Sequence, residues 1–271
     1  MKVVERSVQE IGKSLLVTLP KGWADAVGVK KGTQLKLLVS DRGALSIMPE
    51  HVETERPRDA TIPYDEHFPR RFFKVYFEGN EKITITTKGA TTRDRKEIYL
   101  FLKRFMNLQI IEETAQRVVV KCFRIDDLTL EECLSRMHYL TLSLFESPGP
   151  EQAREIRDTM TRFYYMLVMQ IRRYLSEGRF TDPKTVPLIR AMDYRMVAEK
   201  IQRIGETLAR EKPGKDALVA KAYYARAFSS FINEDFEKAL PLWKEGTRLA
   251  REKGTHAAII RYAKEISMLV R

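Results

Sequence analysis

The sequence predicts a multidomain α+β protein in which a small β-rich head and a small α+β unit precede an all-α region. Two observations predict this arrangement. In residues 1–50, short apolar runs are bounded by turn residues, which is typical of strands. From about residue 129 onward, apolar residues recur every three or four positions, which is typical of helices. A chain of 271 residues is long enough for two or three domains.

The head, residues 1–50, is predicted to contain one helix and four short strands. Pro20 begins the helix, which ends at Gly28. About fifty residues with one helix bury so little apolar area that such a unit rarely folds without a disulfide, a metal or a partner. We therefore expect a partner chain. The predicted strands cover residues 3–4, 15–17, 35–39 and 44–47.

Residues 51–71 are predicted to be a linker, because they contain three prolines and no apolar period. Residues 72–127 are predicted to form a small α+β unit. In this unit, aromatic and β-branched runs indicate strands around a Gly79–Asn80 turn, followed by a helix and a second strand pair. The predicted strands cover residues 72–77, 83–86, 109–111 and 117–120, and the helix covers residues 93–106.

The all-α region is predicted to consist of two antiparallel three-helix bundles joined by short connections. The first bundle covers residues 128–212, and the second, shorter one covers residues 213–271. In the third helix, the predicted core stripe contains Ile189, Met192 and Met196. Breaks at proline and glycine separate the helices.

The composition favours a polyanionic partner. The chain has 48 Lys and Arg against 37 Asp and Glu, a formal net charge of +11.

No apolar run approaches the roughly 18 residues of a membrane span, and the N-terminus lacks the apolar stretch of a signal peptide. Two cysteines, Cys122 and Cys133, are too few for a disulfide framework or a zinc site. We therefore expect a cytoplasmic protein with inert thiols and no membrane span.

Three motifs of the head follow one another in a specific order. Residues 8–21 read VQEIGKSLLVTLPK, residues 27–35 read VGVKKGTQL and residues 41–47 read DRGALSI. This order resembles the AbrB/SpoVT/MazE swapped-hairpin DNA-binding family. The resemblance implies that two chains interleave their hairpins into one barrel-like homodimer. It also implies that basic residues near the first strand and the first turn face double-stranded DNA.

When the family's pattern is carried over position by position, the resemblance implicates Arg6 and Lys13 in DNA binding. We add the neighbouring Ser14 to these candidate DNA-binding residues. Lys21, Lys30 and Lys31 are weaker candidates. Where several relatives place paired arginines in the short helix, this chain has residues 23–25, Trp-Ala-Asp. Charge agrees with the resemblance, because the head has eight basic and five acidic residues, a net +3 that dimerisation doubles to +6.

Four motifs of the second half carry another resemblance. They are LSRMH at residues 134–138, RFYY at 162–165, QIRR at 170–173 and DYRMVA at 193–198. Their order and spacing resemble archaeal PhoU-type phosphate-uptake regulators, over about residues 72–212 and loosely to the C-terminus. The resemblance implies a two-bundle body of six helices that senses or relays phosphate status.

PhoU relatives often bind metal clusters through acidic residues four positions apart, since such residues share a helix face. This chain departs from the pattern, because the corresponding positions are Arg157, Thr161, Gln202 and Glu206. We therefore expect no metal and no cofactor. His138, within a helical stripe, is expected to pack at the edge of the core.

The expected function is a non-enzymatic transcription regulator of phosphate homeostasis, which binds DNA as a dimer and receives its signal through the helices. One alternative is an adaptor that uses the head only for dimerisation and docks on a phosphate transporter ATPase or a sensor protein. A second alternative is a metal-dependent enzyme or metal store in the helical half. Nucleophile elbows and phosphate-binding glycine loops are absent from the sequence.

Overall fold

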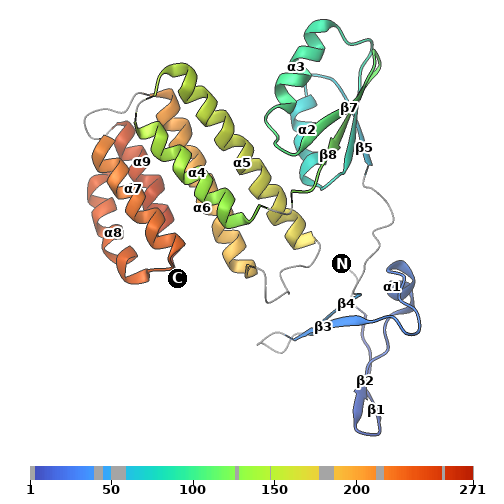
Figure 1. Cartoon of the computed structure of the whole chain (residues 1–271). Coiled ribbons are helices and arrows are strands. Elements are labelled where there is room, and N and C mark those ends of the chain that lie inside the picture. The colour runs from blue at the N-terminus through green and yellow to red at the C-terminus, as the bar shows by residue number, and fades with distance from the viewer. Residues whose placement is uncertain are drawn as a thin grey trace. The chain divides into compact units, whose positions relative to one another are not determined.

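The computed structural model describes residues 4–39, 45–49, 59–125, 128–146, 148–176, 186–211, 217–251 and 254–270. The chain divides into two compact units, Met1–Pro57 and Arg58–Arg271. The second unit comprises an α+β unit and a helical region (Figure 1). The mixed α+β class with a β-rich N-terminal part and a helical C-terminal part agrees with the prediction.

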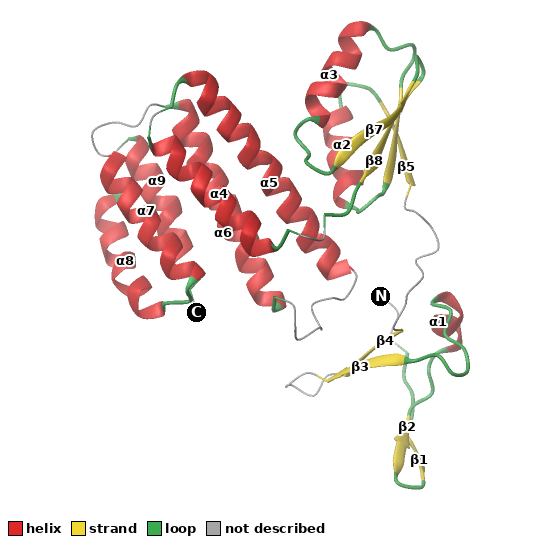
Figure 2. Cartoon of the chain, in the orientation of Figure 1, coloured by secondary structure: helices red, strands yellow, loops and turns green. Residues whose placement is uncertain are grey.

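The head contains two separate antiparallel hairpins with a short helix between them (Figure 2). The strand predicted at residues 3–4 is not observed at Val4, which has no regular structure, and residue 3 lies outside the described residues. The first strand of the head begins at Gln9 instead. The other predicted strands and the helix are confirmed. The elements are β1 (Gln9–Ile11), β2 (Ser14–Leu16), α1 (Lys21–Ala26), β3 (Leu35–Val39) and β4 (Leu45–Pro49).

The α+β unit is a four-stranded sheet in the order β5-β6-β8-β7, accompanied by two helices. β5 runs parallel to β6, whereas the other neighbours are antiparallel. The helices and the sheet enclose a core dominated by aromatic rings, including Phe72 and Tyr76. The elements are β5 (Asp59–Pro63), α2 (Phe68–Phe77), β6 (Lys82–Thr86), α3 (Thr92–Leu102), β7 (Leu108–Glu113) and β8 (Arg117–Cys122).

The prediction of a strand at residues 72–77 is wrong, because these residues form most of α2. The buried side chains of α2 are Phe68, Phe72 and Tyr76, and this spacing of four places them on one helix face. Aromatic residues favour strands only where they fit a sheet, so burial on a helix face overrides that preference. β5 and the start of α2 lie within the stretch predicted as a linker, and residues 51–58 lie outside the described residues.

All six predicted helices of the helical region are confirmed. Their buried side chains form one continuous core, so the two sets of three helices pack against each other. Ile189, Met192 and Met196, which were predicted to be core residues, are exposed. The helices are α4 (Leu130–Phe145), α5 (Pro150–Ser176), α6 (Leu188–Arg210), α7 (Ala217–Ile232), α8 (Phe236–Leu249) and α9 (Thr255–Ser267).

Helix α5 also packs against the α+β unit. The ring of Tyr165 lies 5.2 Å from Phe73 and 5.3 Å from Phe105, measured between centroids. Arg172 Nε donates a hydrogen bond of 2.8 Å to the Phe77 carbonyl. Among the described helices, none has both the length and the apolar composition needed to cross a bilayer.

Candidate nucleic-acid interface

The first place with candidate residues is the tip of the β1–β2 hairpin. Ile11 pairs with Ser14, so Gly12 and Lys13 form a two-residue loop. Gly12 has φ +64° and Lys13 does not share this left-handed conformation, a combination that fits a type II′ turn. The tight turn therefore holds the exposed Lys13 side chain at the end of the hairpin, next to the first residue of β2, Ser14.

The second place is α1 and the turn that follows it. Lys21 is the first residue of α1 and is exposed. After α1, Gly28 at φ +73° ends the helix: its N–H donates to the Asp25 carbonyl, and the Val29 N–H donates to the Ala24 carbonyl, as in a Schellman motif. These hydrogen bonds fix the path of the chain from the helix into the next turn.

Lys30 and Lys31 lie in that next turn, and both are exposed. The backbone N–H of Lys30 donates to Thr33 Oγ1 at 2.9 Å, while the Thr33 N–H donates to the Lys30 carbonyl at 3.0 Å. This reciprocal pair closes the turn and leaves both lysine ammonium groups in solvent. Arg6, the third place, lies in the extended segment before β1, where its Nη1 donates to the Glu5 carbonyl at 3.0 Å.

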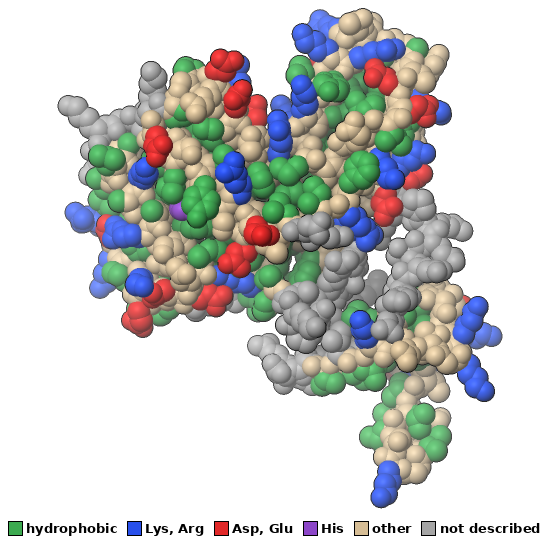
Figure 3. Space-filling view, viewed as in Figure 1, with side chains coloured by type: hydrophobic (Ala, Val, Ile, Leu, Met, Phe, Trp, Pro, Cys, Tyr) green, Lys and Arg blue, Asp and Glu red, His purple; other side chains and the backbone are tan. Residues whose placement is uncertain are grey.

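The five candidate cations share one electrostatic property. Within the described residues, none of Arg6, Lys13, Lys21, Lys30 and Lys31 forms an ion pair, and all are exposed. Figure 3 shows basic side chains at the tip of the hairpin and beside α1. Unpaired exposed cations gain counterion-release energy when they meet phosphates. No hydrogen bond within the described residues joins the three places.

The apolar side chains of the head are exposed to a degree that a folded domain does not sustain alone. Leu15 is 75% exposed, and Pro49 is the one buried residue among the described part of the head. Each covered apolar Å² contributes about 25 cal/mol, so these hairpins gain stability only when something covers them. Others exposed by more than 40% are Val4, Val8, Ile11, Leu16, Val17, Leu37, Val39 and Leu45.

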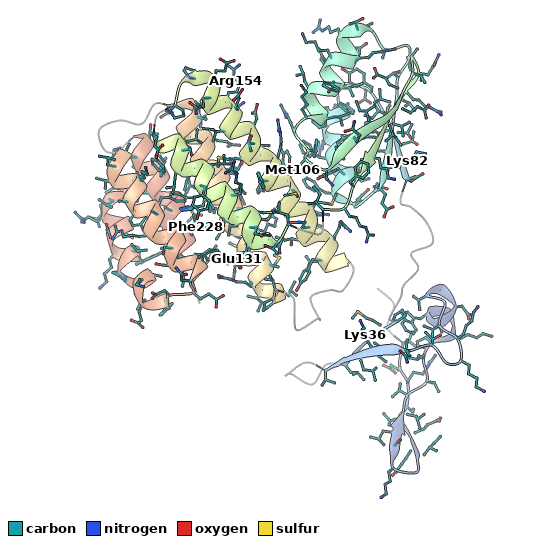
Figure 4. All side chains as sticks on the ribbon, in the orientation of Figure 1. Lys36, Lys82, Met106, Glu131, Arg154 and Phe228 are labelled. Carbon is teal, nitrogen blue, oxygen red and sulfur yellow. The ribbon has the colours of Figure 1, made fainter. Side chains whose placement is uncertain are left out.

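One further exposed cation was missed by the sequence analysis. Lys36 lies on β3 opposite Met48 of β4 (Figure 4). It points to the face opposite Leu37, because side chains alternate along a strand. The alternation of Leu35, Lys36 and Leu37 was the signal that could have identified it.

In the helical region, the four positions considered above for a metal cluster provide one carboxylate. Gln202 Nε2 donates to Thr161 Oγ1 at 2.9 Å and to Glu206 Oε1 at 3.3 Å, so an amide, a hydroxyl and one carboxylate meet between α5 and α6. Among the described residues, no three His, Cys, Asp or Glu side chains are placed to hold a metal ion. Arg157 instead pairs with its neighbour Asp158 at 2.7 Å.

The other singled-out side chains of the second unit are packed. His138 stacks on Phe228 with centroids 3.9 Å apart and shares a hydrogen bond of 3.0 Å with the Tyr224 hydroxyl. Burial lowers the pKa of His138 to about 4, so the ring is neutral near pH 7. Burial also raises the pKa of both thiols, Cys122 and Cys133, to about 12, so both are protonated near pH 7.

The head is thus a small domain of two β-hairpins with exposed cations and uncovered apolar side chains. Residues 8–54 match the family described as "Antidote-toxin recognition MazE, bacterial antitoxin". The head is therefore a MazE/AbrB-type domain, a kind that typically dimerises and binds DNA, and it indicates a DNA-binding or antitoxin-like regulator. Comparison with curated proteins and with solved structures finds no match.

Proposed function

We propose that the chain is a homodimeric transcription regulator that binds duplex DNA through its two heads. The observation that carries this proposal is the combination, within one matched domain, of uncovered apolar hairpins and unpaired exposed cations. Covering the hairpins with a second chain places two sets of cations on one small body. Phosphates then replace the counterions of those cations.

The cations have different roles in this proposal. Lys13 at the hairpin tip and Arg6 before β1 contact the DNA, and Lys21, Lys30, Lys31 and Lys36 contribute to the field that attracts it. Ser14 supplies a hydroxyl that can bond to a phosphate oxygen beside Lys13. Contacts to phosphates position the protein, while contacts to base edges specify a sequence.

The helical region receives the signal in this proposal, and that signal concerns phosphate. The support is the resemblance of the helical motifs to PhoU-type regulators, together with six helices that share one core. A chain of this kind carries no catalytic site, no metal and no cofactor. It acts by changing the DNA affinity or the relative placement of its two heads.

A salt series on the full chain tests DNA binding. We expect the logarithm of the affinity for duplex DNA to fall linearly with the logarithm of salt, with a slope of about −0.9 for each phosphate neutralised. A flat response, or no binding at low salt, would refute the proposal. Crosslinking to DNA in cells, with and without phosphate starvation, tests the phosphate assignment separately: occupancy that ignores starvation contradicts that assignment alone.

A second candidate is the adaptor, in which the head only dimerises and the helices dock on a transporter ATPase or a sensor protein. The exposed stripe of Ile189, Met192 and Met196 on α6 favours it, because such a helix face is a typical contact surface. The salt series separates the two candidates, because an adaptor whose head only dimerises does not bind duplex DNA at any salt concentration.

A further inference from the structure

A second apolar surface lies on α8, and the function proposed above does not use it. Phe236, Leu240 and Trp243 follow one another at spacings of four and three, which places them on one face of the helix. They are 49%, 50% and 45% exposed. α8 lies at the edge of the helical region (Figure 1), so its outer side meets no other described helix.

Helix α9 extends this surface. Lys264 Nζ lies 4.4 Å from the centroid of the Trp243 ring, which places the apolar face of α8 on the side nearest α9. α8 and α9 are consecutive and joined by a short connection, so they run antiparallel. One turn beyond Lys264, Met268 is 55% exposed and follows the same side of α9. We call Phe236, Leu240, Trp243 and Met268 the α8–α9 surface.

Cations flank the α8–α9 surface on both sides. On α8, Lys244 and Arg248 follow Trp243 and Thr247 by one position, so they form the neighbouring stripe. On α9, Lys264 and Arg261 lie across the apolar stripe of α8 from Lys244 and Arg248, on the same side of α9 as Met268, and Arg261 Nη1 also donates to the Ala250 carbonyl. Within the described residues, none of these four forms an ion pair. Figure 3 shows basic side chains along this edge of the helical region.

Two of the acidic groups near the surface form ion pairs with residues outside it. Glu245 pairs with Arg226 at 2.5 Å, and Glu265 pairs with Lys200 at 2.6 Å. Glu237 is the one acidic residue on α8 that forms no ion pair with a described residue. The rim of the α8–α9 surface is therefore net positive.

We propose that the α8–α9 surface binds an amphipathic helix of another protein, with apolar residues on one face and acidic residues on both flanks. The apolar face would cover Leu240, Trp243 and Met268, and its acidic flanks would meet the two rows of cations. A second copy of this chain is a poorer occupant, because pairing two α8 faces brings Lys244 and Arg248 close to their own counterparts. α8 spans about 21 Å, which matches three to four turns of a partner helix.

Tryptophan fluorescence of the full chain tests this proposal. The chain has two tryptophans, Trp23 and Trp243, so Trp23→Phe leaves the α8–α9 surface as the single reporter. The probes are two designed 18-residue peptides with the same apolar helix face, one flanked by glutamates and the other by lysines. We expect the glutamate peptide to shift the Trp243 emission to the blue and to bind at least about tenfold more tightly than the lysine peptide.

Substitutions assign the binding to this surface. Leu240→Asp should abolish the shift, and Lys244→Glu with Arg248→Glu should reverse the preference between the peptides. Tyr139→Asp is the matched control, because Tyr139 is 61% exposed on α4 and lies outside the surface. Equal binding of the two peptides, binding of neither, or binding that survives Leu240→Asp would overturn the proposal. Circular dichroism of each variant verifies that it is folded.

Discussion

The head and the helical region differ in how far a single chain buries their apolar side chains. In the helical region, residues such as Tyr223, Tyr224 and Phe231 are fully buried within the single chain. In the head, most of the described apolar residues of both hairpins are exposed, and no described side chain other than Pro49 is buried. The helices therefore have a core of their own, whereas we expect the head to gain its stability by association.

The largest expected effect comes from placing a charge on the uncovered face of the head. Leu15→Asp removes apolar area from both copies of a dimer and forces two carboxylates into the contact, so we expect dimerisation to weaken by about 4–6 kcal/mol. Sedimentation equilibrium measures this change. The unfolding transition of the helical region should not shift. Dimers that persist unchanged would show that the hairpins are covered in some other way.

The corresponding test of the helical region removes a buried ring. Phe231 has no exposed surface, packs on Tyr194 and lies under the Arg190 guanidinium, whose carbon is 4.2 Å from the ring centroid. Phe231→Ala should lower the free energy of unfolding by about 3–5 kcal/mol. Urea denaturation followed at several protein concentrations measures it. A loss that depends on concentration would contradict the view that these helices are stable within one chain.

Acidification should also destabilise the helical region more than the head. Burial lowers the pKa of His138 from 6.5 to about 4 in the folded chain, so the unfolded chain binds its proton first as the pH falls. The free energy of unfolding is therefore not reduced by this residue above about pH 6.5. It decreases as the pH falls towards 4, by about 2–3 kcal/mol in total. Thermal unfolding between pH 4 and 7 measures the change.

A variant separates His138 from the carboxylates that also titrate in this range. His138→Gln can keep a hydrogen bond to the Tyr224 hydroxyl but has no titrating ring. Its stability should therefore depend less steeply on pH between 4 and 6.5 than that of the unchanged chain. Identical slopes would show that other groups cause the acid sensitivity.

The same contrast explains which features could be predicted from the sequence. The six helices were predictable because each buries a stripe that recurs over at least three turns. α2 was not, because Phe72–Phe77 read alone fits a strand, and the helical spacing is visible only when Phe68 is included. The strand β5 was hidden by Pro57 before it and Pro63 at its end, because closely spaced prolines are typical of a linker.

The candidate site was predictable only in part, and for a related reason. Glycine spacing indicated the turns that carry Lys13, Lys30 and Lys31, and the structure places these lysines on those turns. How the cations combine depends on a second chain, which periodicity within one chain does not describe. On α6, periodicity correctly indicated a helix, but it could not tell that Met192 and Met196 lie on the exposed side of a wide apolar stripe.

The smallest expected effect concerns Lys13, which we propose to contact DNA and not to contribute to stability. Lys13 is exposed at the hairpin tip and forms no ion pair with a described residue, so Lys13→Ala should leave thermal unfolding and dimerisation unchanged. DNA affinity should fall by about 1–2 kcal/mol, and the salt slope should decrease by about 2, because each dimer loses two phosphate contacts. Fluorescence anisotropy with labelled duplexes at several salt concentrations measures both quantities.

The matched control is Lys82→Ala, which removes an exposed lysine from β6 outside the head (Figure 4) and should change neither. A loss of affinity that is equal for all duplexes indicates a phosphate contact, whereas a loss confined to some sequences indicates a base contact. An affinity and a slope that are both unchanged in Lys13→Ala would remove the hairpin tip from the interface.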